Sequence, residues 1–262
     1  MRKRKEKRKD SRQIVAIRYA IFQAPDVDSA SLAEAFIRLF VNRTDTYAEQ
    51  FSVEGGASYR RVEASLTVEI MKKHLAGEAT VASYAINRAN QSCKWICFDI
   101  DRAGANLDDV KREADKLIDV LKKHDIKEES ILREFSGGKG VHVWVFFAEP
   151  IPAIVAYHLG RNAANEAGVQ CEVFPKQKEL LSPFGSLTKI PYGIHRGTKE
   201  RSKAYNSKWE AVEPEYLLRL EPVIIDPKEV EDIKKRLLQT DKGWMDRVID
   251  VGIPYVGDDP PC

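Results

Sequence analysis

Two carboxylates end an apolar run in the middle of the chain, CKWICFDID. Because side chains alternate between the two faces of a strand, Asp99 and Asp101 project together, while Phe98 and Ile100 point to the opposite side. Carboxylates held side by side raise each other's pKa unless a cation lies between them. A hard divalent ion such as Mg²⁺ or Mn²⁺ removes that conflict, so the spacing indicates a metal site. For a D-x-D pattern alone, two solvent-facing acids at a strand end are the alternative.

The run SGGKGVHVWVFF carries a second candidate chemistry. Its glycines, Gly138 and Gly140 among them, leave backbone N–H groups open to bind an anion. Lys139 adds positive charge, Ser136 can donate a hydrogen bond, and His142 shares one strand face with two aromatic residues. We therefore expect a phosphate-binding loop here. A glycine-rich turn followed by a core histidine is the alternative.

A basic segment follows downstream, KIPYGIHRGTKER. It includes Lys189, His195 and Arg196 on a stretch that proline and glycine constrain. An arginine can grip two phosphate oxygens at once, so basic donors on such a loop suit a triphosphate. A solvated charged loop is the alternative.

The middle of the sequence predicts the element order β-α-β-β-α-β, the split βαβ arrangement of ferredoxin-like and RRM-like domains. The elements are a strand ending at Asp101, a helix over 107–124 with Asn106 as N-cap, strands at SILREF and VHVWVFF, a helix ending near Gly168, and a strand at VQCEVF. In that topology the strand order is 4-1-3-2, which places Glu172 on the strand beside the two aspartates. Three carboxylates can hold two metals for phosphoryl transfer, although an ordinary surface glutamate also explains Glu172 by itself.

The flanking segments predict further elements. Helices are expected at about 29–41, 66–76 and 227–239, with a strand at TVASYAIN. The expected fold class is α+β (α/β), with an RRM-like palm and an N-terminal α/β module. We divide the chain into a basic arm, the N-terminal module, the palm with its phosphate-binding segment and a C-terminal helical extension, at residues 1–12, 13–92, 93–210 and 211–262.

Charge and hydropathy narrow the class of protein. The formal net charge is +2, but the first ten residues contain seven of the 42 basic groups and two of the 40 acidic ones, so the remainder is slightly acidic. Polyanion binding must therefore come from local patches and from the basic arm. The chain contains no run of 18 apolar residues, and its basic start is not followed by the apolar region of a signal peptide. We therefore expect no membrane span and a cytoplasmic location.

Together these motifs resemble those of the archaeo-eukaryotic primase superfamily. FDID, SGGKGVH and the strand with Glu172 match, in order and approximate spacing, its hDhD, sGxGxH and third acidic motifs. EVFPKQ followed by LTKIPYGIHRGTK is similar to the branch found in CRISPR-associated primase-polymerases and TOTE conflict systems. The upstream segments NRTDTYAEQF and KKHLAGEATVASYAIN extend the likeness over residues 30–210.

The resemblance implies a role for each motif. Asp99, Asp101 and Glu172 would bind two divalent ions, Mn²⁺ or Mg²⁺. Arg43 and Tyr47 would position the template. The triphosphate of the incoming nucleotide would be held by the glycine-rich loop and the basic segment, through Ser136, Gly138, Lys139, Gly140, His142, Lys189, His195 and Arg196. Many relatives carry Asp at the third acidic position, and their H-R-K-T-G reads H-R-G-T-K in this chain.

The implied activity is that of a DNA-dependent primase-polymerase, which makes and extends primers on single-stranded DNA from dNTPs or NTPs. The final residues, GDDPPC, resemble the start of the Pro-Pro-Cys segment of primase large-subunit-like domains, so we expect a further C-terminal domain. One alternative is another two-metal palm enzyme, a nucleotide cyclase or a metal-dependent nuclease. The other is an RRM-like RNA-binding module, although Val141 and Val143 stand where its stacking aromatic residues belong.

Overall fold

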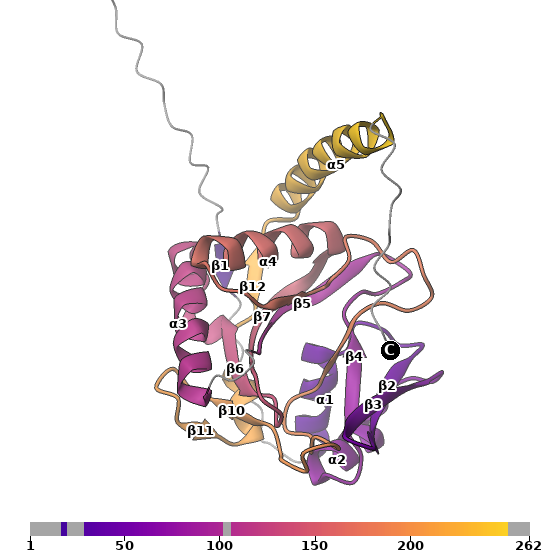
Figure 1. Cartoon of the computed structure of the whole chain (residues 1–262), viewed down its shortest axis with the longest axis vertical. Helices are drawn as coiled ribbons and strands as arrows, with labels where there is room; N and C mark the ends of the chain where they lie inside the picture. The colour runs from indigo at the N-terminus through magenta and orange to yellow at the C-terminus, as the bar shows by residue number, and fades with distance from the viewer. Residues whose placement is uncertain (1–16, 20–28, 102–105, 251–262) are drawn as a thin grey trace, which may run out of the picture.

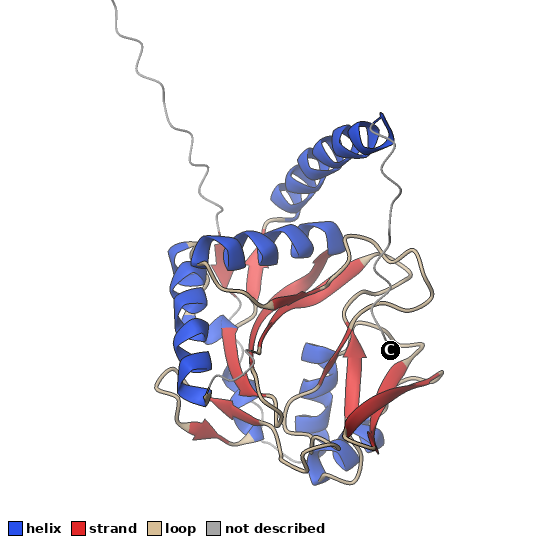
Figure 2. Ribbon diagram, viewed as in Figure 1, coloured by secondary structure: helices blue, strands red, loops and turns tan. Residues whose placement is uncertain are grey.

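The β-α-β-β-α-β order is present in the middle of the chain, as predicted (Figures 1 and 2). The computed structural model describes residues 17–19, 29–101 and 106–250. The basic arm, most of the turn after Asp101 and the GDDPPC ending lie outside the described residues. The six elements are β5 (Ser92–Ile100), α3 (Leu107–Lys123), β6 (Ile131–Phe135), β7 (Val141–Pro152), α4 (Ala153–Ala167) and β8 (Glu172–Phe174).

Local signals set the limits of the two palm helices. The side chain of Asn106 accepts a hydrogen bond from the Asp109 backbone N–H at 2.9 Å, and the Asp109 carboxylate accepts one from the Asn106 N–H in return. This capping box starts α3 at the predicted position. Helix α4 ends where Gly168 takes a left-handed conformation, with φ at +65°, which glycine adopts at little cost.

The large sheet has the predicted strand order. Strand β5 lies between β8 and β7, and β7 pairs with β6 on its other side, all antiparallel. Further strands extend this sheet: β10 and β11 continue it beyond β6, whereas β12 and β1 continue it along the far part of β7. Their bounds are β1 (Ile17–Tyr19), β10 (Lys203–Tyr205), β11 (Ala211–Val212) and β12 (Val223–Ile225).

Different helices cover the two faces of the large sheet. Helices α3 and α4 pack on the face that carries Phe98 and Ile100 (Figure 1). Helix α1 (Ser29–Phe40) packs on the opposite face, where the Phe40 ring lies 5.1 Å from the rings of both Trp144 and Phe146. These aromatic side chains are buried, so this sheet face does not offer the exposed stacking surface that an RRM uses to bind RNA.

A second, four-stranded sheet lies beside the large one, with the order β3-β2-β4-β9. Three strands come from before the palm and one from after β8: β2 (Tyr47–Val53), β3 (Gly56–Val62), β4 (Val81–Tyr84) and β9 (Leu187–Lys189). Strand pairing therefore crosses the boundaries that we predict at residues 92 and 210. Strand β9 pairs with β4 across the first, and β11 and β12 pair with β10 and β7 across the second. Those boundaries remain a sequence-based division.

The remaining elements are one short helix, two 3-10 turns and one long helix. They are α2 (Val68–Ala76), the 3-10 turns η1 (Glu128–Ser130) and η2 (Pro214–Arg219), and α5 (Pro227–Asp250). The predicted C-terminal helix is present and continues past residue 239. None of the helices within the described residues is long and apolar enough to cross a membrane.

A buried histidine fixes the basic segment to helix α2. The fully buried His74 ring accepts a hydrogen bond from the Val81 N–H at 3.1 Å, and its other nitrogen donates to the Pro191 carbonyl at 2.9 Å. Burial lowers the pKa of His74 to about 4, in keeping with this neutral tautomer. A Cβ atom at Gly193 would overlap the ring.

We predict that Gly193→Ala lowers the free energy of unfolding by about 1–3 kcal/mol, because the two hydrogen bonds prevent the His74 ring from moving aside. Denaturant unfolding measures this loss. Gly56→Ala is the matched control, since a Cβ there meets nothing within 4 Å. Equal stability of the two variants would contradict this account of the packing.

Candidate active site

A row of charged side chains crosses four strands of the large sheet. The strand register places Glu172 opposite Asp99, Asp99 opposite His142, and His142 opposite Glu134. All four residues share the sheet face that α1 covers only in part, because residues directly opposite in a ladder project to the same side. From β8 inward, the row therefore consists of two acids, a base and a third acid.

Glu134 is the buried end of this row and was not predicted as a site residue. Its carboxylate is fully buried and accepts hydrogen bonds from His142 Nδ1 and Trp144 Nε1, both at 2.9 Å. Lys189 Nζ, from the second sheet, lies 3.3 Å from its other oxygen. Burial alone would raise the pKa of Glu134, but Lys189 and His142 hold it at about 2. The strand alternation of ILREF beside VHVWVFF is the sequence signal that could have found it.

His142 links the buried acid to the predicted metal-binding pair. Its Nδ1 faces Glu134, and its Nε2 lies 3.5 Å from Asp99 Oδ1. Burial alone would lower the pKa of His142, but the carboxylates of Asp99 and Glu134 raise it to about 10. The imidazole is therefore doubly protonated and donates from both nitrogens. Burial would likewise raise the pKa of Asp99, but His142 holds it below its ordinary value.

The glycine-rich loop packs directly on the D-x-D pair. A Cβ atom at Gly140 would lie 2.9 Å from the Ile100 carbonyl oxygen, 3.1 Å from Asp99 Oδ1 and 3.3 Å from Asp101 Cβ. Only a residue without a side chain allows this approach. The predicted metal-binding and phosphate-binding motifs are thus neighbours in space.

The three carboxylates provide the oxygen donors that Mg²⁺ and Mn²⁺ prefer. Asp101 is exposed, and Glu172 is exposed with its carboxylate 2.9 Å from Lys176 Nζ. Within the described residues, no three His, Cys, Asp or Glu side chains already converge as a metal-binding group. The donor types and their shared sheet face fit a divalent ion. To bind it, the Glu172 carboxylate would have to leave its ion pair with Lys176.

The glycine-rich loop and the basic segment also meet. The Thr198 hydroxyl donates to the Gly137 carbonyl at 2.5 Å, and a Cβ at Gly137 would lie 3.2 Å from His195 Cβ. Gly137 has φ at +78°, which turns the loop toward this contact. Burial, with the nearby cations Lys189 and Lys199, lowers the pKa of His195, so its imidazole is neutral at pH 7. His195 thus lies beside the loop, and its contact with the triphosphate remains a prediction.

Three predicted residues do not face the cleft. The Arg196 guanidinium donates to the Gly77 carbonyl at 3.0 Å. Arg43 is buried, and its guanidinium binds Asp45 and the Pro183 carbonyl, the latter at 2.8 Å. Tyr47 is also buried. Their predicted contacts with phosphates or template remain predictions that these side-chain positions do not favour.

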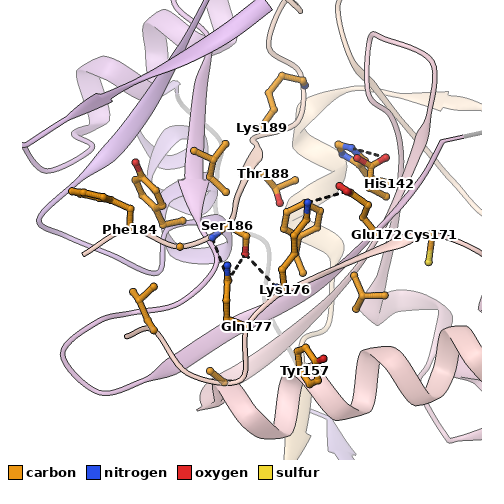
Figure 3. A pocket seen from close by; sticks show the side chains of 18 of the residues that line it. His142, Tyr157, Cys171, Glu172, Lys176, Gln177, Phe184, Ser186, Thr188 and Lys189 are labelled. Carbon is orange, nitrogen blue, oxygen red and sulfur yellow. Dashed lines mark hydrogen bonds and ion pairs between the residues drawn. The ribbon is translucent and has the colours of Figure 1, made fainter. Parts of the chain in front are cut away.

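One open cleft of about 3390 Å³ brings the candidate residues together (Figure 3). Its lining includes the three carboxylates, the glycine-rich loop and His195. Lys189 and Thr188 come from β9 on the facing sheet, as Figure 3 shows. Tyr157, from α4, lines the side behind β8.

This palm, with acids on its open sheet face and a glycine-rich loop against them, is of the archaeo-eukaryotic primase type. Residues 32–231 match the family described as "TOTE conflict system, Archaeo-Eukaryotic Primase domain". The chain belongs to this family, which confirms the resemblance of its motifs and favours the TOTE branch. Members of the wider superfamily are nucleotidyltransferases that bind DNA and nucleotides and generally use divalent metals.

Solved structures of similar fold include three proteins. The primase-polymerase AEP domain of cyanophage S-2L is 15% identical, with a TM-score of 0.44 over 76% of this chain and 100% of that chain. The polymerase domain of Mycobacterium tuberculosis ligase D, in complex with DNA, is 14% identical, with a TM-score of 0.47 over 72% and 84%. Primase RepB' is 12% identical, with a TM-score of 0.38 over 86% and 69%. The comparison with curated proteins found no match.

We predict that Glu134→Gln lowers the free energy of unfolding by about 3–5 kcal/mol, because it leaves two buried cations without their shared anion. An amide that still accepts from His142 and Trp144 would also turn its NH₂ group toward the Lys189 ammonium. Denaturant unfolding measures the loss. The double variant Glu134→Gln, Lys189→Met should recover part of it, whereas additive losses would show that the pair does not interact.

The low pKa of Glu134 predicts that the free energy of unfolding decreases in acid. Because the pKa of Glu134 is lower in the folded chain than its ordinary 4.5, its contribution is complete above that pH and is lost as the pH falls toward about 2. The unfolding free energy of the wild type should therefore decline more steeply below pH 4.5 than that of Glu134→Gln. Parallel pH profiles would contradict this assignment.

Proposed function

We propose that this chain is a DNA-dependent primase-polymerase that joins nucleotides on a single-stranded template by a two-metal mechanism. The observation that carries the proposal is the placement of Asp99 and Asp101 against Gly140, with Glu172 opposite Asp99 on the next strand. This arrangement puts a metal-binding edge and an anion-binding loop in one cleft. Nucleotidyl transfer needs both, because it joins a triphosphate to a hydroxyl.

In this proposal Asp99, Asp101 and Glu172 hold the divalent ions. The ions supply charge neutralisation at the triphosphate and lower the pKa of the attacking 3′-hydroxyl. Glu172, now paired with Lys176, would be the third residue to hold these ions. Asp99 is already held ionised by His142, so it needs no deprotonation at neutral pH.

The triphosphate lies along the glycine-rich loop. Backbone N–H groups of this loop, the Ser136 hydroxyl and the Lys139 ammonium donate to its oxygens, and His195 lies close enough to Gly138 to join them. When Asp99 holds a metal, the Nε2–H of His142 is available to the same oxygens. Lys189 supports the site indirectly, because its ammonium is bound to Glu134 rather than directed at the substrate.

The template and primer occupy the rest of the cleft, and the incoming nucleotide is a dNTP or an NTP. Primer synthesis requires two nucleotides bound together opposite the template, the first supplying the hydroxyl. Catalysis on this basis is mostly positioning and charge stabilisation.

We predict that the purified chain, given primer-free single-stranded DNA, labelled nucleotides and Mn²⁺ or Mg²⁺, makes template-dependent products. The double variant Asp99→Asn, Asp101→Asn should lose at least about 1,000-fold in rate, since both metal-binding carboxylates are gone. Denaturing gels measure the products. Asp119→Asn, an exposed carboxylate on α3, is the control and should match the wild type.

A pre-annealed primer and a template-free reaction separate the alternatives. Extension without priming would restrict the proposal to polymerase activity. Template shortening would indicate a nuclease, and a cyclic mononucleotide formed without template would indicate a cyclase. Silence with and without primer would reject nucleotidyl transfer by this chain.

We also predict that Gly140→Ala lowers the rate about 100-fold, because the added methyl group displaces the Asp99 carboxylate and the strand end that carries it. Single-turnover extension of an annealed primer measures the rate. Asp119→Asn, outside the cleft lining, again serves as control. An unchanged rate in Gly140→Ala would mean that the contact between the two motifs is not needed for the chemistry.

A further inference from the structure

Two apolar side chains are exposed on the rim of the cleft, on the loop between β8 and β9. Leu181 is 86% exposed and Phe184 is 42% exposed, and both line the cleft that contains the three carboxylates. Figure 3 shows Phe184 across the cleft from Glu172. None of the sequence motifs includes either residue. We call residues 180–186 the platform loop.

Side-chain hydrogen bonds hold the platform loop at several points. The Leu180 N–H donates to Gln91 Oε1 at 2.8 Å, and the Ser186 hydroxyl donates to Gln177 Oε1 at 3.0 Å. Between them, Arg43 donates to the Pro183 carbonyl at 2.8 Å. Arg43, predicted from sequence to contact the template, therefore supports the loop from inside the protein instead.

The Arg61 guanidinium packs against the Phe184 ring. The Arg61 guanidinium, from β3, lies 3.9 Å from the ring centroid and is also paired with Glu63. This contact fixes one side of the aromatic ring, while part of the ring stays accessible from the cleft. An aromatic ring anchored in this way is a preformed surface for a flat, apolar ligand group.

The charges along the cleft favour a polyanion that carries such groups. Apart from the three carboxylates, the charged residues near the platform loop and α4 are mainly basic: Arg61, Arg161, Lys176 and Lys178, against Glu179. A nucleic-acid single strand combines unstacked bases with a phosphate backbone, and proteins bind it by aromatic stacking within a basic groove. An apolar protein segment would use the exposed side chains but not these charges.

We propose that the platform loop binds single-stranded nucleic acid, with one base stacked on Phe184, Leu181 packed against the next base, and Arg61 as support. The inference rests on the proposed function for the identity of the strand as template. It adds a binding site outside the residues that the motifs assign. The loop also lines the cleft that contains the three carboxylates, so a strand bound there can extend toward them.

The test is fluorescence anisotropy of a labelled thymidine oligomer with the full chain, in EDTA and without nucleotide. Phe184→Ala should weaken binding about five- to hundredfold, the range for loss of one base stack. Phe184→Leu should weaken it similarly, because leucine keeps the apolar character and loses the flat ring, whereas Phe184→Tyr should bind nearly as the wild type does. Phe51→Ala is the matched control, since Phe51 is 39% exposed and does not line the cleft.

The salt dependence provides an independent measurement. Lys178→Gln, which removes a basic side chain from the cleft lining, should reduce the slope of log affinity against log salt concentration by about 0.7, as expected for one phosphate contact on a single strand, while Phe184→Ala should leave the slope unchanged. A uridine oligomer run in parallel identifies whether DNA or RNA is preferred. Loss of binding by Phe184→Ala on the preferred strand supports the proposal.

Two results would overturn it. Wild-type affinity in Phe184→Ala would show that no base stacks there, and wild-type affinity in Phe184→Leu with loss in Phe184→Ala would show that an apolar contact, and not stacking on a flat ring, holds the oligomer. Thermal unfolding of the variants checks that the fold is kept, as expected for exposed positions. The variant Asp99→Asn, Asp101→Asn should still bind the oligomer, so a failure of catalysis and a failure of strand binding are distinguishable.

Discussion

The burial of the Glu134 carboxylate is the constraint on which the rest of the site depends. A fully buried carboxylate is costly unless opposite charges and hydrogen-bond donors surround it. Here His142 and Trp144 come from the large sheet and Lys189 from the small one, so the acid is satisfied only when the two sheets lie at one relative position. The cleft between these sheets, and the distance between its walls, follow from that requirement.

The same sheet face packs against helix α1 at one end and carries the candidate site at the other. Along β7, Trp144 and Phe146 are covered by helix α1, whereas His142 stands at the border between the covered and the open parts. The His142 and Trp144 side chains are both buried, but His142 lines the cleft and Trp144 does not. The doubly protonated imidazole connects the covered and the open parts, because one of its N–H groups faces the buried Glu134 and the other faces the partly exposed Asp99.

The sequence predicts what depends on local periodicity. Strand alternation, the Asn106 cap and the ferredoxin-like order together place Glu172 on one side of Asp99 and the glycine-rich loop on the other, and the structure has this arrangement. What it does not predict are interactions between segments far apart in the chain. The pairing of β9 with β4 brings Lys189 to Glu134, and no local signal marks that pairing. The hydrogen bond from the Arg196 guanidinium to the Gly77 carbonyl likewise joins segments far apart in the chain, and no local signal predicts it.

The unequal burial of the three carboxylates follows from the cost of burying charge. The fold largely encloses Asp99, for which it provides a cation in His142, and leaves Asp101 and Glu172 exposed to water. Three enclosed carboxylates without metal would each cost several kcal/mol, and one histidine could not compensate for them. A glutamate at the third position suits this division, since its carboxylate pairs with the Lys176 ammonium at 2.9 Å. Two exposed carboxylates avoid this cost and remain available as oxygen donors for the proposed metal.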